Sequence, residues 1–300
     1  MILVTGAGGV IGSAVLARGR ELGLDIRGLV RQCDPEAQSK SIIACDLAHC
    51  ASLPDAIEGC PDAVIHLAAA VPHSTRYPDT EGTATLTRRI DACVHEAAAR
   101  WGCHVVYAST CGLYDRLSTV QKVESSDDLI RIESPYFAAK LEGERRFASL
   151  PSCTVLRLPA PIGAGIPDSL VVCRFVAQAL VGGTLGVWGS GRREQNFVDS
   201  SDLADATLAA VRVRWHGTIN VAAQQPVTMH ELADRVVNVV GRGKVELSGK
   251  ADPRDLETAR YSTERATRVL NWTPRVTLAQ SIRSLAEHIS VTHPLDASQR

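Results

Sequence analysis

The sequence contains few aromatic residues and almost no net charge. Phenylalanine, tryptophan and tyrosine make up 4% of the 300 residues, and the formal net charge is −1 at pH 7. Proteins that bind nucleic acid through its phosphates carry excess positive charge, and those that bind single strands also use aromatic side chains for base stacking. The composition therefore predicts neither a nucleic-acid partner nor attraction to an anionic membrane.

Long apolar runs and paired metal ligands are also missing. No apolar run reaches the roughly 20 residues needed to span a bilayer. The first expected strand begins at Ile2, which leaves no room for a signal peptide. The nine cysteines include no C-x-x-C pair, which predicts reduced thiols, no bound metal and a cytoplasmic location.

Short apolar segments alternate with helical patterns over the first half of the chain. This alternation predicts an α/β fold, a doubly wound parallel sheet of the Rossmann-like kind, over residues 1–160. The strands are expected at residues 2–5, 26–30, 41–44, 63–67, 104–108 and 154–158, and helices at 10–22 and 83–100.

The sequence changes character after Leu158. Five prolines and glycines lie within residues 159–167, which predicts a loop that leaves the sheet and borders a cleft. We expect a smaller α/β substrate lobe over residues 161–300, interleaved with segments near 195–221 that return to the main sheet. In this part we expect helices at 170–181, 202–213 and 229–240, strands at 184–188 and 218–221, and a loose tail after 289.

A glycine turn joins the first strand to the first helix. Gly6, Gly9 and Gly12 follow the spacing G-x-x-G-x-x-G, whereas G-x-G-x-x-G fails because its last position is Ile11. Glycine allows a sharp turn and a close backbone approach to a pyrophosphate, which the helix N-terminus then faces. The sequence thus predicts a dinucleotide site that includes Gly6, Gly9, Val10, Ile11 and Gly12.

The end of the second strand bears on the choice of dinucleotide. Arg31 follows this strand directly, and the nearest acid, Asp34, lies three residues further on. An arginine here pairs with the 2′-phosphate of NADP, whereas an acid binds the ribose 2′-hydroxyl of NAD. Arg31 therefore favours NADP over NAD. Asp46 and Leu47, which follow the third strand, are candidates to cover the adenine edge.

Tyr136 and Lys140 form a candidate catalytic pair. They lie four residues apart, and Ser134 and Pro135 supply an N-cap and a first-turn proline. Both side chains should therefore lie on one face of a helix, about one turn apart. Free tyrosine has a pKa of about 10, and a nearby ammonium lowers that pKa by favouring the phenolate. We expect Lys140 to tune Tyr136 in this way.

A pair of hydroxyls follows the fifth strand. Ser109 and Thr110 stand at its carboxyl end, where parallel sheets build their sites. Either hydroxyl could hold a reacting oxygen, although such pairs also form turns and helix caps. Cys111 is a candidate second acid or base, but a buried thiol is the more common role. His73 fits a surface position better than a substrate contact.

Together these segments resemble the extended short-chain dehydrogenase/reductase family, the NAD(P)-dependent epimerase/dehydratase group. The resemblance covers nearly the whole chain and rests on six short motifs in the family's order. They are the nucleotide fingerprint at residues 5–12, the strand-four segment at 66–69, the hydroxyl segment at 109–114, the catalytic helix start at 134–140, and substrate-lobe landmarks at 197–202 and 271–274.

The resemblance implies a site and a mechanism. Counting back from Tyr114 assigns the catalytic hydroxyl to Thr110. Tyr136 would exchange a proton with a substrate hydroxyl or carbonyl, and Lys140 would bind the cofactor ribose. Hydride would pass between the substrate carbon and nicotinamide C4. The family acts mostly on nucleotide-linked sugars. Further cofactor contacts are implied for Leu67, Ala68, Ala69 and Ser109.

Four positions depart from the family. Its sugar 4,6-dehydratases carry an Asp-Glu pair after the catalytic threonine, where this chain has Cys111 and Gly112. A 4,6-dehydratase is therefore not expected. The family often has an asparagine that contacts substrate phosphate and an arginine that clamps the diphosphate. This chain has Ala160 and Gln195 there, with two arginines slightly upstream that could serve as the clamp.

Three functions remain open. The first is an NAD(P)-dependent sugar-nucleotide epimerase or keto-reductase. The second, favoured by Ala160 and Gln195, is an NADP-dependent reductase of a small carbonyl compound without a nucleotide. The third is a redox-sensing binding protein, which the intact threonine, tyrosine and lysine argue against because a sensor needs no proton donor. For an enzyme, the family also implies a homodimer paired through helices near residues 83–100 and 134–150.

Overall fold

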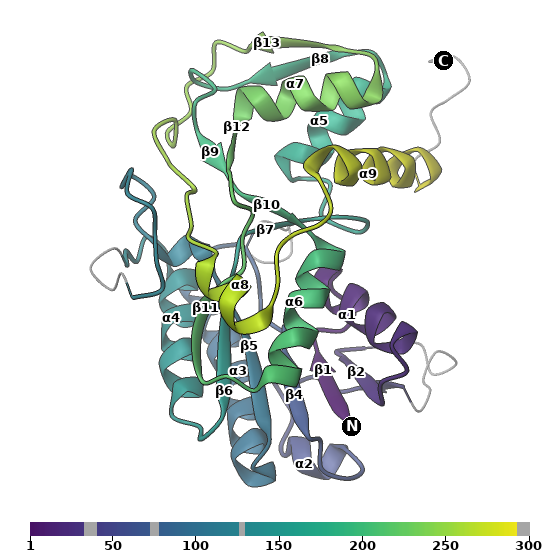
Figure 1. Ribbon diagram of the computed structural model, residues 1–300, viewed down its shortest axis with the longest axis vertical. Coiled ribbons are helices and arrows are strands. Elements are labelled where there is room, and N and C mark those ends of the chain that lie inside the picture. Colours follow the sequence, from purple (N-terminus) through teal and green to yellow (C-terminus); the bar gives the residue numbers. More distant parts are fainter. Residues whose placement is uncertain (33–40, 73–77, 126–129, 293–300) are drawn as a thin grey trace.

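The computed structural model shows a large part built on one sheet and a smaller lobe at one end of it (Figure 1). It describes residues 1–32, 41–72, 78–125 and 130–292. Seven strands pair in parallel in the order β11-β6-β5-β4-β1-β2-β3, which confirms the predicted sheet. The strands are β1 (Ile2–Thr5), β2 (Ile26–Val30), β3 (Ile42–Ala44), β4 (Ala63–His66), β5 (His104–Thr110), β6 (Cys153–Leu158) and β11 (Gly217–Asn220).

The direction of strand addition reverses between β1 and β4. From β1 the chain adds β2 and β3 on one side, and it then adds β4, β5, β6 and β11 on the other. Open parallel sheets bind ligands at such a switch point, beyond the carboxyl ends of the strands. The switch point lies between Thr5 and His66, which are paired in register at the ends of β1 and β4.

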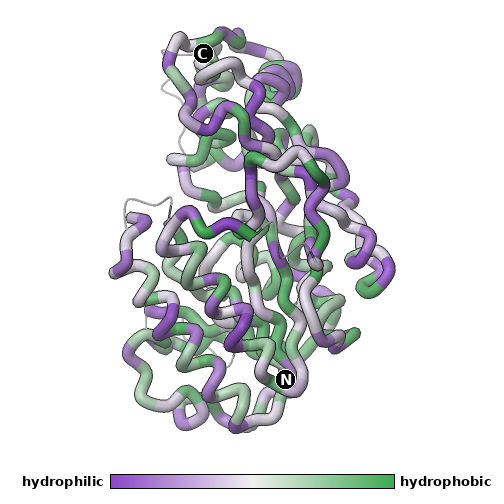
Figure 2. The backbone as a smooth tube through the Cα atoms, turned by 90° about the vertical axis from the view of Figure 1, so that its left-hand side faces the viewer, coloured by the Kyte–Doolittle hydropathy of each residue, from purple (hydrophilic) through white to green (hydrophobic). Residues whose placement is uncertain are grey.

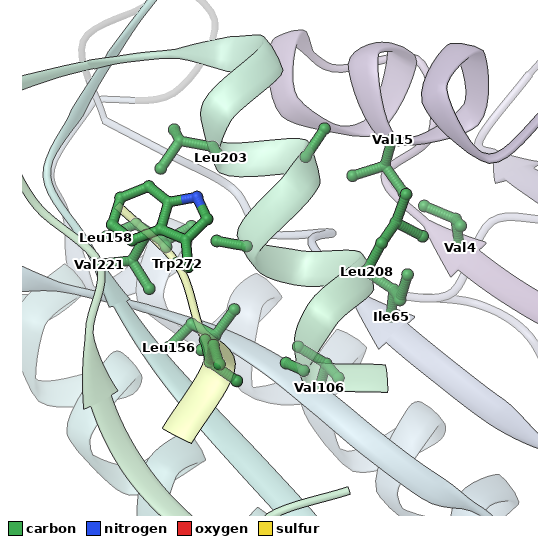
Figure 3. Packing of buried hydrophobic residues seen from close by; sticks show 14 of the residues in the cluster. Val4, Val15, Ile65, Val106, Leu156, Leu158, Leu203, Leu208, Val221 and Trp272 are labelled. Carbon is green, nitrogen blue, oxygen red and sulfur yellow. The ribbon is translucent and has the colours of Figure 1, made fainter. Parts of the chain in front are cut away.

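Helices cover both faces of the sheet. On one face, α1 (Val10–Glu21) and α6 (Ser200–Val213) pack over apolar side chains of the strands. Figure 3 shows Leu208 of α6 beside Ile65 of β4 and Val4 of β1. The other face is covered by α2 (Leu53–Ala56), α3 (Glu81–Trp101) and α4 (Pro135–Ala148). Burial on both faces explains why the strands read as continuous apolar runs.

A late segment of the chain also returns to the sheet. α8 (Glu264–Leu270) places Ala266 and Leu270 in the same core as α6, and Trp272 follows them (Figure 3). The indole Nε1 of Trp272 donates a hydrogen bond of 2.9 Å to the carbonyl of Asp202. The sequence predicted a return of residues near 195–221, and β11 pairs with β6 at the edge of the sheet, but the sequence gave no indication of this second return.

The smaller lobe has its own apolar core. It is formed by α5 (Val171–Leu180), α7 (Met229–Val240) and α9 (Leu278–Thr292). The expected tail after Ile289 is wrong at its start, because α9 continues to Thr292. Three two-stranded sheets accompany these helices: β7 (Ala160–Ile162) with β10 (Phe197–Asp199), β8 (Thr184–Val187) with β13 (Lys244–Leu247), and β9 (Glu194–Gln195) with β12 (Val227–Thr228).

Hydropathy along the backbone follows this architecture. Figure 2 shows hydrophobic segments inside the large part and hydrophilic segments on its outer helices. Even α3, the longest helix, alternates buried and exposed positions. Among the residues that the structure describes, no helix combines the length and apolarity needed to cross a membrane.

Candidate active site

The glycine turn packs tightly at the switch point. Gly6 has a left-handed φ of +68°, and a Cβ there would come within 2.7 Å of the backbone nitrogen of Ala68. A Cβ at Gly12 would collide with the carbonyl oxygen of Gly6, and one at Gly9 would lie 3.2 Å from the same oxygen. The backbone conformation and its close contacts therefore require glycine at positions 6 and 12.

The start of α1 fits an anionic group. Its N-cap residue is Gly9, which has no side chain to satisfy the first backbone N–H groups, and the first turn contains no acid. Val10 and Ile11 supply the next backbone amides, while their side chains pack against the lobe core and the sheet core respectively. Free amides and the helix dipole suit a pyrophosphate at this end.

The residues predicted near the adenosine divide into exposed and buried groups. Arg31 is exposed just beyond β2, and Asp34 lies outside the described residues. The Asp46 carboxylate accepts a 3.1 Å bond from the Ala48 amide, and the bond from His49 holds the pKa of Asp46 below its usual range. Leu47 is buried in the sheet core. The backbone of Leu47, rather than its side chain, is therefore left to face a nucleotide, and its place at the adenine edge stays a prediction.

The segment after β4 is fixed to the end of β1. The Leu67 amide donates to the carbonyl of Thr5 over 3.3 Å, and the Ala68 amide donates to Thr5 Oγ1 over 3.2 Å. Leu67, Ala68 and Ala69 are half-buried, so this segment forms one wall beside the glycine turn. His73, the other candidate in this loop, lies outside the described residues.

The structure separates the two hydroxyls at the end of β5. Ser109 is buried, and its hydroxyl donates to Glu144 Oε1 over 2.5 Å. Thr110 is half-buried, and its Oγ1 accepts a 3.0 Å bond from the Gly112 amide. The hydroxyl proton of Thr110 thus remains to be donated elsewhere. Of the two, Thr110 is the better candidate for holding a substrate oxygen, and Ser109 has only its backbone left for a cofactor.

Cys111 is part of the core rather than of an exposed surface. Its side chain is buried, and its thiol donates to the carbonyl oxygen of Arg157 over 3.2 Å. Burial raises the pKa of this thiol far above its ordinary value, which opposes formation of the reactive thiolate. The structure therefore favours the packing role over the acid–base role.

Tyr136 lies in the first turn of α4. This helix starts as expected, with Ser134 Oγ accepting from the Phe137 amide over 3.3 Å and Pro135 at the first position. Burial raises the pKa of Tyr136, and the carboxylates of Asp91 and Asp79 raise it further. The expected lowering of this pKa by the neighbouring lysine is therefore wrong for the protein's own groups, because burial and two acids dominate.

Lys140 lies one turn further along α4 and is almost completely buried. Its Nζ lies 4.1 Å from the centre of the Tyr107 ring, a cation–π distance. Burial lowers the pKa of Lys140, while the charges of Asp91 and Glu144 oppose that shift. The lysine is thus held over Tyr107, midway along β5, by the ring below it and by two nearby acids.

Sequence reasoning missed a polar network beneath these residues. His66 and Asp91 are fully buried, and His66 Nε2 lies 3.0 Å from Asp91 Oδ1. The Tyr107 hydroxyl donates to Asp91 Oδ2 over 2.9 Å. A signal existed: Thr83, Thr87 and Asp91 recur every four residues on the buried face of α3, where a charged residue calls for a partner.

The two arginines that could clamp a diphosphate directly precede β9. Gln195 lies in β9, and Ala160 lies in β7. Arg192 is exposed, and its Nε donates to Ser190 Oγ over 2.9 Å. Arg193 is the less exposed of the pair, and its Nε lies 3.3 Å from Asp252 Oδ2 without a hydrogen bond of good geometry among the described residues.

Metal ligands do not gather in the part of the chain that the structure describes, since no group of three or more His, Cys, Asp or Glu side chains could hold an ion there. The eight cysteines in that part are free thiols.

Comparison with known proteins places this site in a family. Residues 2–222 match the NAD dependent epimerase/dehydratase family. The chain belongs to this family. Solved structures with the same overall fold include MoeE5 in complex with UDP-glucose and NAD, at a TM-score of 0.80 and 27% identity over 97% of this chain and 99% of that chain. The resemblance found in the sequence is thereby confirmed.

Two curated epimerase/dehydratase relatives differ in coverage. A UDP-glucose 4-epimerase from Mycolicibacterium smegmatis (strain ATCC 700084 / mc(2)155) is 27% identical over 307 residues, which span 95% of this chain and 97% of that protein. A putative GDP-L-fucose synthase 2 from Oryza sativa subsp. japonica is 35% identical over 118 residues, which span 38% of this chain and only 33% of that protein.

Proposed function

We propose that this chain is an NAD(P)-dependent epimerase or keto-reductase that acts at a carbinol or keto carbon of a sugar nucleotide. The observation that carries the proposal is the placement of three groups at the carboxyl end of β5. Thr110 ends that strand, Lys140 lies against its Tyr107 ring, and Tyr136 stands one turn before Lys140 on α4. The glycine turn that begins α1 lies at the adjoining switch point.

Each residue has a defined task in this proposal. Tyr136 exchanges a proton with the reacting oxygen of the substrate. Thr110 donates a hydrogen bond to that same oxygen, because its own oxygen already accepts from the Gly112 amide. Lys140 holds the ribose next to the nicotinamide and places a positive charge near Tyr136. When bound, the nicotinamide supplies hydride exchange with the substrate carbon.

A nucleotide diphosphate handle is supported from two sides. A UDP-glucose 4-epimerase is similar to this chain over 95% of its length, and MoeE5 was solved with UDP-glucose. In this chain, Arg193 is a partly buried arginine close to position 195, and it is paired with Asp252, which a phosphate would have to displace. A bidentate arginine is well suited to phosphate. Ala160 and Gln195, in contrast, support the second candidate, a reductase of a small carbonyl compound.

The reaction proposed is not a 4,6-dehydration. That reaction places an acid at position 112 in the related dehydratases. Here Gly112 lies against Phe137, and a Cβ at position 112 would come within 2.6 Å of two ring carbons. A longer carboxylate side chain would need still more room, so the neighbourhood of Thr110 cannot take one without moving Phe137.

We propose that the site binds NAD. Arg31 favours NADP, so we propose that the same site also accepts NADP. MoeE5 was solved with NAD, whereas Arg31 stands exposed beyond β2, where it could pair with a 2′-phosphate. Arg31→Asp should weaken NADP binding at least tenfold relative to NAD. Equal changes in the affinities for NAD and NADP would show that Arg31 does not discriminate between them.

We also propose a cytoplasmic homodimer paired through α3 and α4. Within one chain these helices are joined by Arg88, whose Nε donates to Glu142 Oε2 over 2.7 Å. Light scattering of the purified protein tests the pairing, and a mass of one chain at micromolar concentration would contradict it.

The deciding experiment compares the native protein with Tyr136→Phe. Nucleotide sugars and small carbonyl compounds are screened for isomer formation and for dinucleotide oxidation, which separates an epimerase from a reductase. We expect turnover of UDP-hexoses by the native protein, a loss of two to four orders of magnitude in Tyr136→Phe on the order of general acid–base effects, and unchanged NAD binding. Full turnover in the variant would refute the role of Tyr136, and NAD binding without any turnover would favour the redox sensor.

A further inference from the structure

A single buried carboxylate connects the two halves of the site. Asp91 lies in the middle of α3 and is 1% exposed. Its two oxygens point to different strands: Oδ1 to His66 Nε2 at the end of β4, and Oδ2 to the Tyr107 hydroxyl in β5. Beyond His66 lies the glycine turn, and above Tyr107 lies Lys140.

The hydrogen bonds on the His66 side have a fixed direction. Burial lowers the pKa of His66 despite the nearby Asp91, so the imidazole is neutral at pH 7. Burial opposes the ionisation of Asp91, but the bond from His66 and the charge of Lys140 outweigh it and hold the pKa of this carboxyl below its usual value. An ionised carboxylate only accepts, so the single imidazole proton must be on His66 Nε2.

The other ring nitrogen must then accept. His66 Nδ1 lies 2.7 Å from Thr5 Oγ1, so the Thr5 hydroxyl donates to it. The same Thr5 oxygen accepts from the Ala68 amide over 3.2 Å. Ala68 is the residue against which Gly6 packs. The chain of bonds from Asp91 thus ends in the backbone that shapes the glycine turn.

The second arm ends at Lys140. Asp91 holds the Tyr107 hydroxyl, and the Tyr107 ring lies 4.1 Å below Lys140 Nζ. Gly143 shows how closely α4 approaches this pair, because a Cβ there would come within 2.5 Å of Asp91 Oδ2 and even nearer to the Tyr107 hydroxyl. The helix that carries Tyr136 and Lys140 therefore rests directly on the Asp91–Tyr107 bond.

We propose that Asp91 is a positioning residue that fixes the dinucleotide-binding turn through His66 and Thr5, and the catalytic lysine through Tyr107. This rests on the proposed function, in which Lys140 binds the ribose and Tyr136 transfers the proton. One carboxylate then positions both the glycine turn and Lys140, which lie on opposite sides of the proposed dinucleotide site. Removing its charge should alter dinucleotide affinity and proton transfer together.

Asp91→Asn is the sharpest variant because asparagine has the same shape and can keep both bonds. Its Oδ1 can accept from Tyr107 while its Nδ2 donates to His66 Nε2, provided the imidazole proton moves to Nδ1. The hydrogen-bond order towards Thr5 then reverses. Nitrogen-15 NMR of the imidazole reports this tautomer directly and does not depend on catalysis. We expect the proton on Nε2 in the native protein. In the variant it moves to Nδ1 when the amide nitrogen faces His66, and it stays on Nε2 when the amide oxygen does.

The negative charge of Asp91 predicts how its removal should change kcat and NAD binding. The groups that face Tyr136 and Lys140 are Asp79, Asp91 and Glu144 with negative charge, and His66 and Tyr107 as neutral groups. Asp91 raises the pKa of Tyr136 and of Lys140. Neutralising Asp91 should therefore shift the pH dependence of kcat by roughly one unit to lower pH. The Kd for NAD should rise roughly tenfold as a charge-assisted bond is lost.

Two matched variants separate the arms. Thr5→Val removes only the hydroxyl towards the turn and should raise the Kd for NAD without changing the pH dependence of kcat. Tyr107→Phe keeps the ring under Lys140 but removes its bond to Asp91. It should change the pH dependence of kcat while the imidazole proton of His66 stays on Nε2. Circular dichroism melts of all variants show whether each is folded at the assay temperature.

The outcomes distinguish this inference from the proposed function. A native Kd for NAD together with a native pH dependence of kcat in the folded Asp91→Asn variant would overturn the role of Asp91. Full turnover in Tyr136→Phe would overturn the proposed function, whereas the NAD affinities would still decide on Asp91.

Discussion

The ring of Phe137 lies directly against Gly112, so that any side chain at position 112 would meet it. Phe137 is the residue after Tyr136 in the first turn of α4, and Gly112 is bonded to Thr110 through its amide. The contact therefore joins the two parts of the site that carry the hydroxyls, and it sets their spacing.

Gly112→Ala tests this contact. The added methyl would lie within 2.6 Å of the Phe137 ring, and overpacking of this kind costs about 1–3 kcal/mol of unfolding free energy. We expect a lower midpoint in urea unfolding together with reduced turnover, and partial recovery in Gly112→Ala combined with Phe137→Leu. An unchanged midpoint in the single variant would show that the ring moves freely.

Thr110 should contribute through its hydroxyl alone. Thr110→Val keeps the shape, removes the donor to the substrate oxygen, and is expected to lower kcat on the order of 100-fold, the effect of losing one such donor. Thr110→Ser retains a hydroxyl and should stay within a few-fold of the native rate. Steady-state kinetics on the identified substrate decides this, and equal losses in both variants would point to packing instead.

Gly143→Ala should destabilise the protein strongly. Its methyl would overlap the Tyr107 hydroxyl and the Asp91 carboxylate, so overpacking adds to a broken buried hydrogen bond, together about 3 kcal/mol or more. Gly82→Ala in α3 is the matched control. Only Thr80 Oγ1 lies near a Cβ there, at 3.8 Å, so alanine should stabilise α3 slightly. Equal unfolding free energies for the two variants would refute this account.

The stability of the protein should fall in mild acid through His104. Burial, together with the charge of Arg214, lowers the pKa of His104 to about 4. The unfolded chain binds a proton near pH 6.5, whereas the folded protein resists it until about pH 4. This contribution is complete above pH 6.5 and is lost as the pH falls towards 4, by about 3 kcal/mol.

His104→Gln isolates this effect. Glutamine does not titrate, so the variant should lose less stability than the native protein between pH 6.5 and 4, whatever its stability at pH 7. Unfolding free energies from urea titrations at several pH values give the two slopes. Parallel slopes would assign the acid sensitivity to other buried groups, such as His66.

Several helices and strands follow from local patterns in the sequence. The expected strand at 26–30 and helix at 229–240 match β2 and α7 residue for residue, because strong apolar periods and clear end signals agree there. β5 extends two residues beyond its expected end, through Ser109 and Thr110. Their polarity marks the edge of the core rather than the end of the strand.

The lobe was less predictable. α9 and β13 were not expected, and β13 is mostly exposed, so its short sequence carries no strong alternation. α8 and Trp272 belong to the core under α6, although residues 221–263 separate α8 from β11. Such a return depends on long-range packing, which no local period records.

The sequence by itself determined the order of the strands, the glycine turn, and the helix that presents Tyr136 four residues before Lys140, because each depends on neighbours along the chain. Tertiary structure alone decided which hydroxyl is free, why the pKa of Tyr136 rises, and that Asp91 joins the two halves of the site. These properties come from burial and from charges on other elements. His66 and Asp91 are 25 positions apart in the sequence, and the fold brings His66 Nε2 to 3.0 Å from Asp91 Oδ1.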